Sequence, residues 1–126
     1  MWSVSQDATA AECAGLGAKL ATGPEPTALL VMGDGSARRS RRAPGYLDDR
    51  AAAFDAAVEQ AIRSGHMASL LAIDPGLARD LMATGRPAWQ ALAAALGEAT
   101  LSVDVQYAGD PFGVWYIAAS LLPTTR

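Results

Sequence analysis

The spacing of the apolar residues changes near residue 100, and this change constrains the fold more than any other feature. Between residues 47 and 97 the apolar residues recur every three or four positions, as on one face of a helix. From Leu101 to Tyr107 they alternate with polar residues, and this alternation predicts a half-buried strand. Turn-forming residues fill 108–113, and the apolar run Val114–Leu122 predicts a second strand. We therefore expect an antiparallel hairpin after a helical region.

Two further strands and a helix are expected before residue 33. Residues 2–5 predict a short strand. Thr9 and Glu12 form a capping box, which predicts a helix that ends at Gly23. Thr27–Met32 is apolar enough to predict a strand buried on both faces. A strand, a helix and a strand in this order predict a right-handed βαβ unit with parallel strands.

Helix start and stop signals divide the middle of the chain into several helices. Proline and capping residues stand at the predicted starts and glycines at the ends. The predicted helices cover residues 47–63, 67–72, 74–85 and 87–97. The fold class expected from the whole pattern is α/β, with a small mixed sheet packed against four or five helices. With 126 residues, the chain is expected to form one domain over 1–126.

Composition excludes several classes of protein. Apolar residues make up 51% of the chain and charged residues 18%, so a buried core is expected rather than disorder. The longest strongly apolar run has nine residues, far below the roughly 20 that span a membrane. The first residues have no basic segment and predict no signal peptide. A net charge of −3 argues against nucleic acid as the main partner. A soluble, cytoplasmic protein is expected.

Two residue counts limit the chemistry. The single cysteine, Cys13, excludes an internal disulfide and a cysteine-based zinc site within one chain. The single histidine, His66, cannot supply the two imidazoles of a two-His-one-carboxylate iron site. No metal site and no cofactor are therefore expected in the isolated chain.

The best candidate site is the loop Gly33-Asp34-Gly35-Ser36, which follows the predicted strand Thr27–Met32. Ligands of open α/β sheets bind beyond the carboxyl ends of parallel strands. The two glycines permit a close approach of the backbone, while Asp34 and Ser36 supply an acceptor and a hydroxyl. Arg38 stands where a dinucleotide-binding loop would have its third glycine. The alternative interpretation is a tight turn in which Asp34 caps backbone N–H groups.

Four arginines follow this loop within five residues, and Arg38 and Arg39 are the candidate anion-binding pair. Arginine binds phosphate and carboxylate groups through two parallel hydrogen bonds. The remaining members of the cluster are Arg41 and Arg42. One alternative is a loop that is solvated or contacts another subunit. Another is a nucleic-acid contact, although no aromatic residue interleaves with the cluster to support it.

Other candidates each have a structural alternative. His66 is a general base if Ser64 or Ser69 is a nucleophile, and otherwise a surface residue. Asp80 is either a lone metal carboxylate or an exposed helix acid. Three aromatic residues either line a pocket for an aromatic ligand or belong to the core: Trp89, Trp115 and Tyr116.

The stretch Leu29–Arg39 resembles the loop of the class III extradiol ring-cleavage dioxygenases of the subunit-B-like family, in which active relatives carry Ser-Gly-Asp-Leu-Ser-His-Arg. It is most similar to an actinobacterial branch with Met-Gly-Asp-Gly-Ser-Ala-Arg. The resemblance covers nearly all of this chain but only about the C-terminal half of the family's domain. It continues through residues 43–48, 54–58, 70–75, 85–89 and 113–120.

This resemblance implies a relative of non-haem Fe(II) enzymes that open catechol rings with dioxygen. Asp34 and Ser36 match the family's loop, but Ala37 stands where the family has its acid–base histidine. Two histidine ligands of the iron belong to the half of the domain that this chain lacks. The family's metal carboxylate comes from the segment around residues 80–85, where no glutamate occurs.

We therefore expect a catalytically inactive, truncated relative that acts as a binding or assembly module. The first alternative is a part of an Fe(II) extradiol dioxygenase whose histidines come from another chain, and the second is a small-anion binding protein. The expected partner is either a second copy in a dimer or a complementary chain that carries the N-terminal half. The strands expected nearest the contact are Thr27–Met32 and Val114–Leu122.

Overall fold

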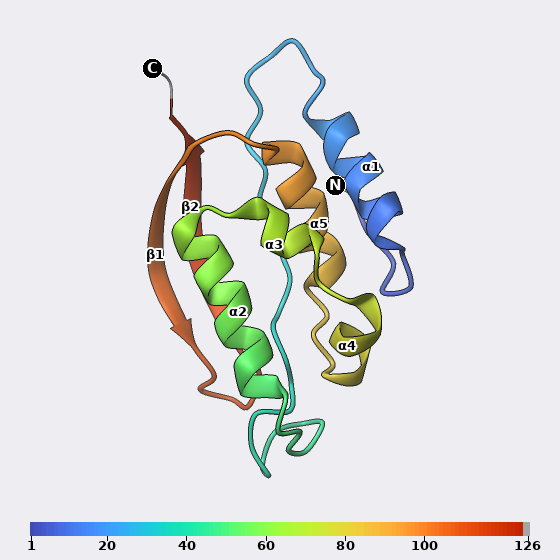
Figure 1. Ribbon diagram of the computed structural model, residues 1–126, viewed down its shortest axis with the longest axis vertical. Helices are drawn as coiled ribbons and strands as arrows, with labels where there is room; N and C mark the ends of the chain where they lie inside the picture. Colours follow the sequence, from blue (N-terminus) through green and yellow to red (C-terminus); the bar gives the residue numbers. More distant parts are fainter. Residues whose placement is uncertain (125–126) are drawn as a thin grey trace.

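The computed structural model describes residues 1–124 and contains five helices and a two-stranded antiparallel sheet over that range (Figure 1). The predicted α/β class is therefore confirmed. The helices are α1 (Ala10–Leu20), α2 (Ala51–Ser64), α3 (Met67–Leu71), α4 (Pro75–Asp80) and α5 (Arg86–Leu96), and the strands are β1 (Leu101–Gly109) and β2 (Tyr116–Pro123).

Several helix ends coincide with signals in the sequence, but α2 begins at Ala51 rather than at residue 47, and α4 ends at Asp80 rather than at residue 85. At α1 the Thr9 hydroxyl accepts a hydrogen bond from the Glu12 N–H, while the Glu12 carboxylate accepts one from the Thr9 N–H. These bonds hold the pKa of Glu12 below its usual value. The Asp74 carboxylate caps α4, and Gly65 ends α2 in the left-handed conformation at φ 69°.

The hairpin follows the predicted alternation. β1 and β2 pair in antiparallel register, with Val103 opposite Leu121 and Val105 opposite Ala119. These side chains are half-buried and pack against the core, whereas the intervening side chains face solvent. An irregularity between Val105 and Tyr107 interrupts the register. The hairpin therefore has one face on the core and one in water, as antiparallel sheets often do.

The two strands predicted before residue 33 do not form, and neither does the parallel βαβ unit. Residues 2–5 and Thr27–Met32 lie outside the two strands of the described residues. None of the N–H groups of residues 23–34 donates a hydrogen bond to another main-chain group within 1–124. Leu30 and Met32 are 88% and 76% exposed, so this segment is not buried on both faces. Its apolar composition predicted a strand, but the paired strand on either side is missing.

The core lies between the helices and the inner face of the hairpin. Its centre includes Trp115, the residue just before β2, together with Phe54 and Val58 of α2, Leu70 of α3 and Trp89 of α5. Figure 1 shows α2 against the hairpin and α1 beside α5, with the segment after α1 running the length of the molecule to the loop at one end. No helix within residues 1–124 has the length and apolar character needed to cross a membrane.

Candidate functional site

Main-chain hydrogen bonds fix the candidate loop against two other parts of the chain. The Gly35 N–H donates to the Trp115 carbonyl at 2.7 Å, and the Trp115 N–H donates to the Ser36 carbonyl at 2.9 Å. The Ala37 N–H donates to the Leu81 carbonyl at 3.1 Å, just after α4. The loop therefore lies against the start of β2 and the connection from α4 to α5, rather than open to a ligand.

The glycines of the loop allow this close packing. A Cβ on Gly33 would lie 2.6 Å from Gly85 Cα, and a Cβ on Gly35 would overlap the Trp115 ring and lie 2.9 Å from Asp55 Oδ1. Gly85 in turn packs on the Trp89 ring. Real Cβ contacts do not come so near. These glycines therefore make room for protein atoms, not for a phosphate.

Ser36 and Asp55 form a buried pair at the base of the loop. Both residues are fully buried. The Ser36 hydroxyl donates to Asp55 Oδ2 at 2.5 Å, and the Ser36 N–H donates to Oδ1 at 2.9 Å. Arg39 Nη1 lies 3.2 Å from Asp55 Oδ2, and Arg39 Nε lies 3.2 Å from Asp110 Oδ2. The network joins the loop to α2 and to the turn between β1 and β2.

This network positions the loop and supplies no nucleophile. The Ser36 hydroxyl already gives its proton to a carboxylate, and no imidazole contacts it within the described residues. Nucleophilic catalysis needs an adjacent base and access for the substrate. Asp34, by contrast, is exposed and makes no side-chain hydrogen bond within residues 1–124. The structure thus separates the two residues that match the family's loop.

Ala37 has no open space around it. It is 6% exposed, and its carbonyl accepts a hydrogen bond from the Gly45 N–H at 2.8 Å. An imidazole at this position would have to displace packed atoms. The residue that the resemblance puts in place of the acid–base histidine therefore lies in the core of the loop.

Arg38 and Arg39 make internal contacts. Arg38 Nη1 donates to the Asp80 carbonyl at 2.9 Å and lies 3.9 Å from Asp48 Oδ2. Arg39 contacts the two carboxylates described above. The other two arginines, Arg41 and Arg42, are exposed and form no ion pair within residues 1–124. An anion at Arg38 and Arg39 would have to compete with partners that are already bound.

A second ion-pair group lies beside the loop, at the start of α2. Arg50 Nη2 and Nε donate to the Asp48 carboxylate at 2.8 and 3.0 Å. These bonds hold the pKa of Asp48 well below its usual value and raise the pKa of Arg50. Asp80 Oδ2 is 3.7 Å from Arg50 Nη1, and the Asp80 side chain is 60% exposed. Asp80 is therefore an exposed helix acid with a weak ion pair.

The remaining candidates, His66 and the aromatic group, occupy positions typical of structural residues. The His66 side chain is exposed, with its Nδ1 2.6 Å from the Ser69 hydroxyl at the start of α3. Trp89 and Trp115 are core residues, 4% and 2% exposed, and Tyr116 is half-buried. These positions agree with the structural alternatives for the aromatic group and for the histidine.

The donor set does not fit an iron site. Within residues 1–124 no three histidine, cysteine, aspartate or glutamate side chains are grouped so that they could hold a metal ion. Asp34 lies in the loop that resembles the family's, and Asp80 lies in the segment from which the family's metal carboxylate comes. Asp34 makes no side-chain hydrogen bond within residues 1–124, whereas Asp80 forms an ion pair with Arg50. No catalytic step through Fe(II) is therefore assigned to these residues.

Sequence reasoning missed two buried polar groups. Asp55 lies three residues before Val58 and seven before Ile62, so helical periodicity places it on the buried face of α2, and this signal was available. Arg86 is 2% exposed, and its guanidinium donates to Gln90 Oε1 at 3.1 Å and to the Gln6 carbonyl at 3.0 Å. It also lies 3.7 Å from the Cys13 thiol, whose pKa is raised by burial. Nothing in the sequence indicates this second group.

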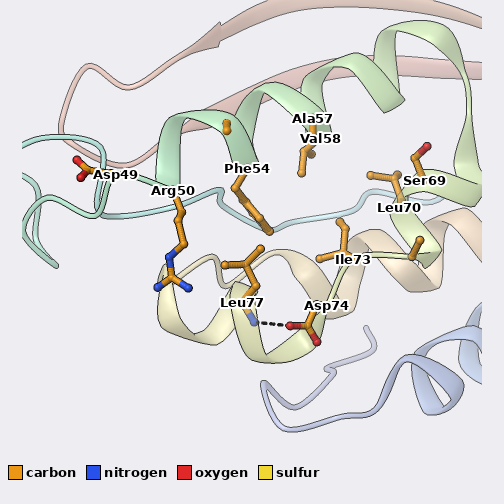
Figure 2. A pocket seen from close by; sticks show the side chains of 12 residues that line it. Asp49, Arg50, Phe54, Ala57, Val58, Ser69, Leu70, Ile73, Asp74 and Leu77 are labelled. Carbon is orange, nitrogen blue, oxygen red and sulfur yellow. Dashed lines mark hydrogen bonds between the residues drawn. The ribbon is translucent and has the colours of Figure 1, made fainter.

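A cavity of about 710 Å³ lies between α2, α3 and α4 (Figure 2). Phe54, Val58, Ile73 and Leu77 form apolar walls. Three polar groups at its rim have partners: Arg50 pairs with Asp48, the Asp74 carboxylate accepts the Leu77 N–H at 3.1 Å, and the Ser69 hydroxyl lies 2.6 Å from His66 Nδ1. Asp49 also lines the cavity and makes no side-chain hydrogen bond within residues 1–124, so it is the one lining carboxylate there without a partner.

A groove of about 660 Å³ lies between the segment 27–33 and β2. Its floor is apolar and comes from Ile62 of α2 and from Trp89, Leu92 and Leu96 of α5. The segment 27–33 forms one side and β2 the other. β2 pairs only with β1 in the described structure, so its edge toward the groove has no ladder.

Neither protein-family models nor curated proteins give a match to this sequence. The resemblance of the loop to the extradiol dioxygenases therefore stays a prediction, and the function is argued from the geometry of the chain.

Proposed function

We propose that this chain is a non-catalytic binding and assembly module that docks an extended segment of another polypeptide along the free edge of β2. The observation that carries the proposal is the 660 Å³ groove beside an unpaired strand. An open strand edge offers a row of N–H and C=O groups that pair readily with another chain.

The composition of the two strand edges supports this choice of surface. β2 has no charged residue between Tyr116 and Pro123. β1 has Asp104 and the irregularity at Gln106. Charges and bulges protect a strand edge from unwanted pairing. The edge of β1 therefore has such protection, while the edge of β2 does not.

The side chains around the groove support a macromolecular partner. Leu30 and Leu122 are 88% and 67% exposed, and both line the groove. Grouped exposed apolar side chains are typical of contact surfaces. The apolar floor and the open backbone together favour a peptide segment over a small polar ligand.

The absence of catalysis is proposed on residue grounds. One histidine is fewer than the two imidazoles that a two-His-one-carboxylate iron site requires. Ser36 is committed to Asp55, and Ala37 replaces the imidazole that the resemblance expects. The module is then a relative of the extradiol dioxygenases in fold, with a contact surface in place of a catalytic site.

The test is iron loading of the wild type and of Ala37→His. The purified chain is incubated anaerobically with Fe(II), exposed to air with catechols, and followed by the absorbance of ring-opened products. We expect no turnover from either protein, because an added acid–base group contributes only about 10²–10⁴-fold and cannot replace a metal site. Melting temperatures check that the variant folds. Iron-dependent turnover by the wild-type chain would refute the non-catalytic assignment.

A further inference from the structure

Two unpaired main-chain edges face each other across the groove. β2 forms its ladder with β1 on one side only. The segment 27–33 is extended, and none of its N–H groups donates to the main chain within residues 1–124. Unpaired backbone groups beside an apolar floor are costly when water is excluded from them. Any occupant of this groove therefore gains most if it pairs with both sides.

The groove has the size of a short strand. In a sheet with strands about 4.8 Å apart and layers about 10 Å thick, one extended residue fills about 160 Å³. The 660 Å³ of the groove is therefore enough for at least about four residues.

The two sides run in opposite directions. Gly35 and Ser36 are bonded to Trp115 at the start of β2, while Thr27 and Leu29 line the groove together with Leu121 and Pro123 at its end. A strand between them is consequently parallel to one neighbour and antiparallel to the other. The result is a mixed sheet of four strands.

We infer that the groove binds a single extended strand of a different polypeptide. Both edges of this partner strand are free before binding; one pairs with β2 and the other with residues 27–33. This inference rests on the proposed function and names its partner. It gives the strand order β1, β2, partner strand, segment 27–33.

A second copy of this chain does not satisfy the groove. β2 of a second copy has one edge occupied by its own β1, so it can pair with only one side. The segment 27–33 of a second copy could enter only by leaving its own groove half-paired. The number of hydrogen bonds that the partner can form thus favours a different polypeptide over a second copy of this chain. This argument chooses between the two partners expected from the sequence.

The lining residues define the chemistry of the strand. Ile62, Trp89 and Leu92 on the floor require apolar side chains at alternate positions of the strand, because alternate side chains point to one face. Glu25 is the one ionisable side chain among the described residues that line the groove. A lysine or arginine near one end of the strand would complement this charge.

The experiment uses the full chain and a pool of synthetic peptides of about nine residues. The peptides are acetylated and amidated, with Val, Ile, Leu or Phe at alternate positions and Ser, Thr, Lys or Glu at the others. We expect retained peptides to carry Lys near one end. Glu25→Gln should weaken such a peptide about two- to fivefold and leave its Lys-to-Ser analogue unchanged.

Backbone N-methylation of the best peptide tests pairing on both edges. Consecutive N–H groups of a strand point to opposite edges, so methylation of the odd or of the even residues blocks one edge at a time. We expect each of the two methylated peptides to lose about tenfold or more in affinity, because several hydrogen bonds disappear together. Ala95→Arg, which places a long side chain in the groove, should abolish binding, whereas Ala56→Arg on an exposed part of α2 should not.

The contrary outcomes are separable. A loss with only one of the two methylated peptides overturns the double pairing. No peptide retained at about 100 µM overturns the strand as occupant and, with it, the docking role at β2, and leaves the non-catalytic assignment standing. A dimer whose β2 edge is protected from exchange makes a second copy the occupant. Iron-dependent turnover, in contrast, refutes the non-catalytic assignment and says nothing about the groove.

Discussion

Three glycines decide how closely the candidate loop packs. Gly33 and Gly85 touch backbone to backbone, and Gly35 lies under the Trp115 ring. No residue with a Cβ fits these positions without movement of the main chain. The loop is therefore shaped by contacts inside the protein, and its resemblance to a ligand-binding loop is a likeness of residues rather than of space.

Gly35→Ala tests this packing. We expect the free energy of unfolding to fall by about 1–3 kcal/mol, because the new methyl group overlaps Trp115 and approaches Asp55. The matched control is Gly15→Ala in α1, where nothing lies within 4 Å of the added Cβ. It should be neutral or stabilising by up to about 1 kcal/mol. Urea unfolding measures both, and equal effects would contradict the packing argument.

Asp48 gives the stability a dependence on acid pH. Its pKa in the folded chain lies below the unfolded value of about 3.9, because Arg50 binds the charged form. Its contribution is therefore complete above about pH 5 and is lost as the pH falls through the folded pKa.

Unfolding of Asp48→Asn between about pH 6 and pH 2 tests this contribution. The difference in stability between wild type and variant should shrink as the pH falls. The adjacent Asp49→Asn, at an exposed carboxylate without a hydrogen bond in the described structure, should keep a constant small difference. A wild-type advantage over Asp48→Asn that persists at the acid end would contradict the role of Arg50.

At the scale of elements, the sequence predicts local structure well and partnered structure poorly. The capping box at Thr9, the Asp74-Pro75 start of α4 and the alternation after Leu101 depend on neighbouring residues, and all three predictions are confirmed. Thr27–Met32 is strand-like in composition, but a strand exists only with a partner, and no pattern within the segment shows whether one is present.

The same distinction holds for the candidate site: the sequence predicts its local features but not its contacts with distant segments. Asp34, Ser36, Arg38 and Arg39 are close in sequence, but the contacts that fix their roles come from α2, from the hairpin turn and from the end of α4. The helical position of Asp55 predicts burial, yet its partner Ser36 lies 19 residues earlier. Periodicity identifies which residues are buried and does not identify which polar groups meet.

Asp55→Asn tests the contact between α2 and the loop. We expect a loss of about 2–3 kcal/mol in the free energy of unfolding, because the buried carboxylate accepts three hydrogen bonds and faces the Arg39 guanidinium. Asp104→Asn on β1, whose exposed carboxylate accepts only from Gln106, should change stability by less than about 0.5 kcal/mol. Thermal and urea unfolding give the comparison. A loss no larger than that of Asp104→Asn would mean that the network does not hold the loop.

At the scale of the whole molecule, helices cover one face of the hairpin and the groove leaves one edge of β2 open. α5 lies beside α1 (Figure 1). Its residues provide most of the groove floor. A sheet of two strands is small for a chain of 126 residues, and its apolar edge strand is open to pairing. The proposed partner strand would extend this sheet without a change in the helices.

Amide hydrogen exchange along residues 117–122 of the isolated chain, followed by NMR, tests the open edge most directly. Successive N–H groups of β2 point alternately to β1 and to the groove. We predict alternating protection, with one set of amides exchanging slowly and the other exchanging fast, as in unpaired backbone. Slow exchange of both sets in the isolated chain would mean that residues 27–33 or a second copy already cover the edge, and the account of an open docking strand would be wrong.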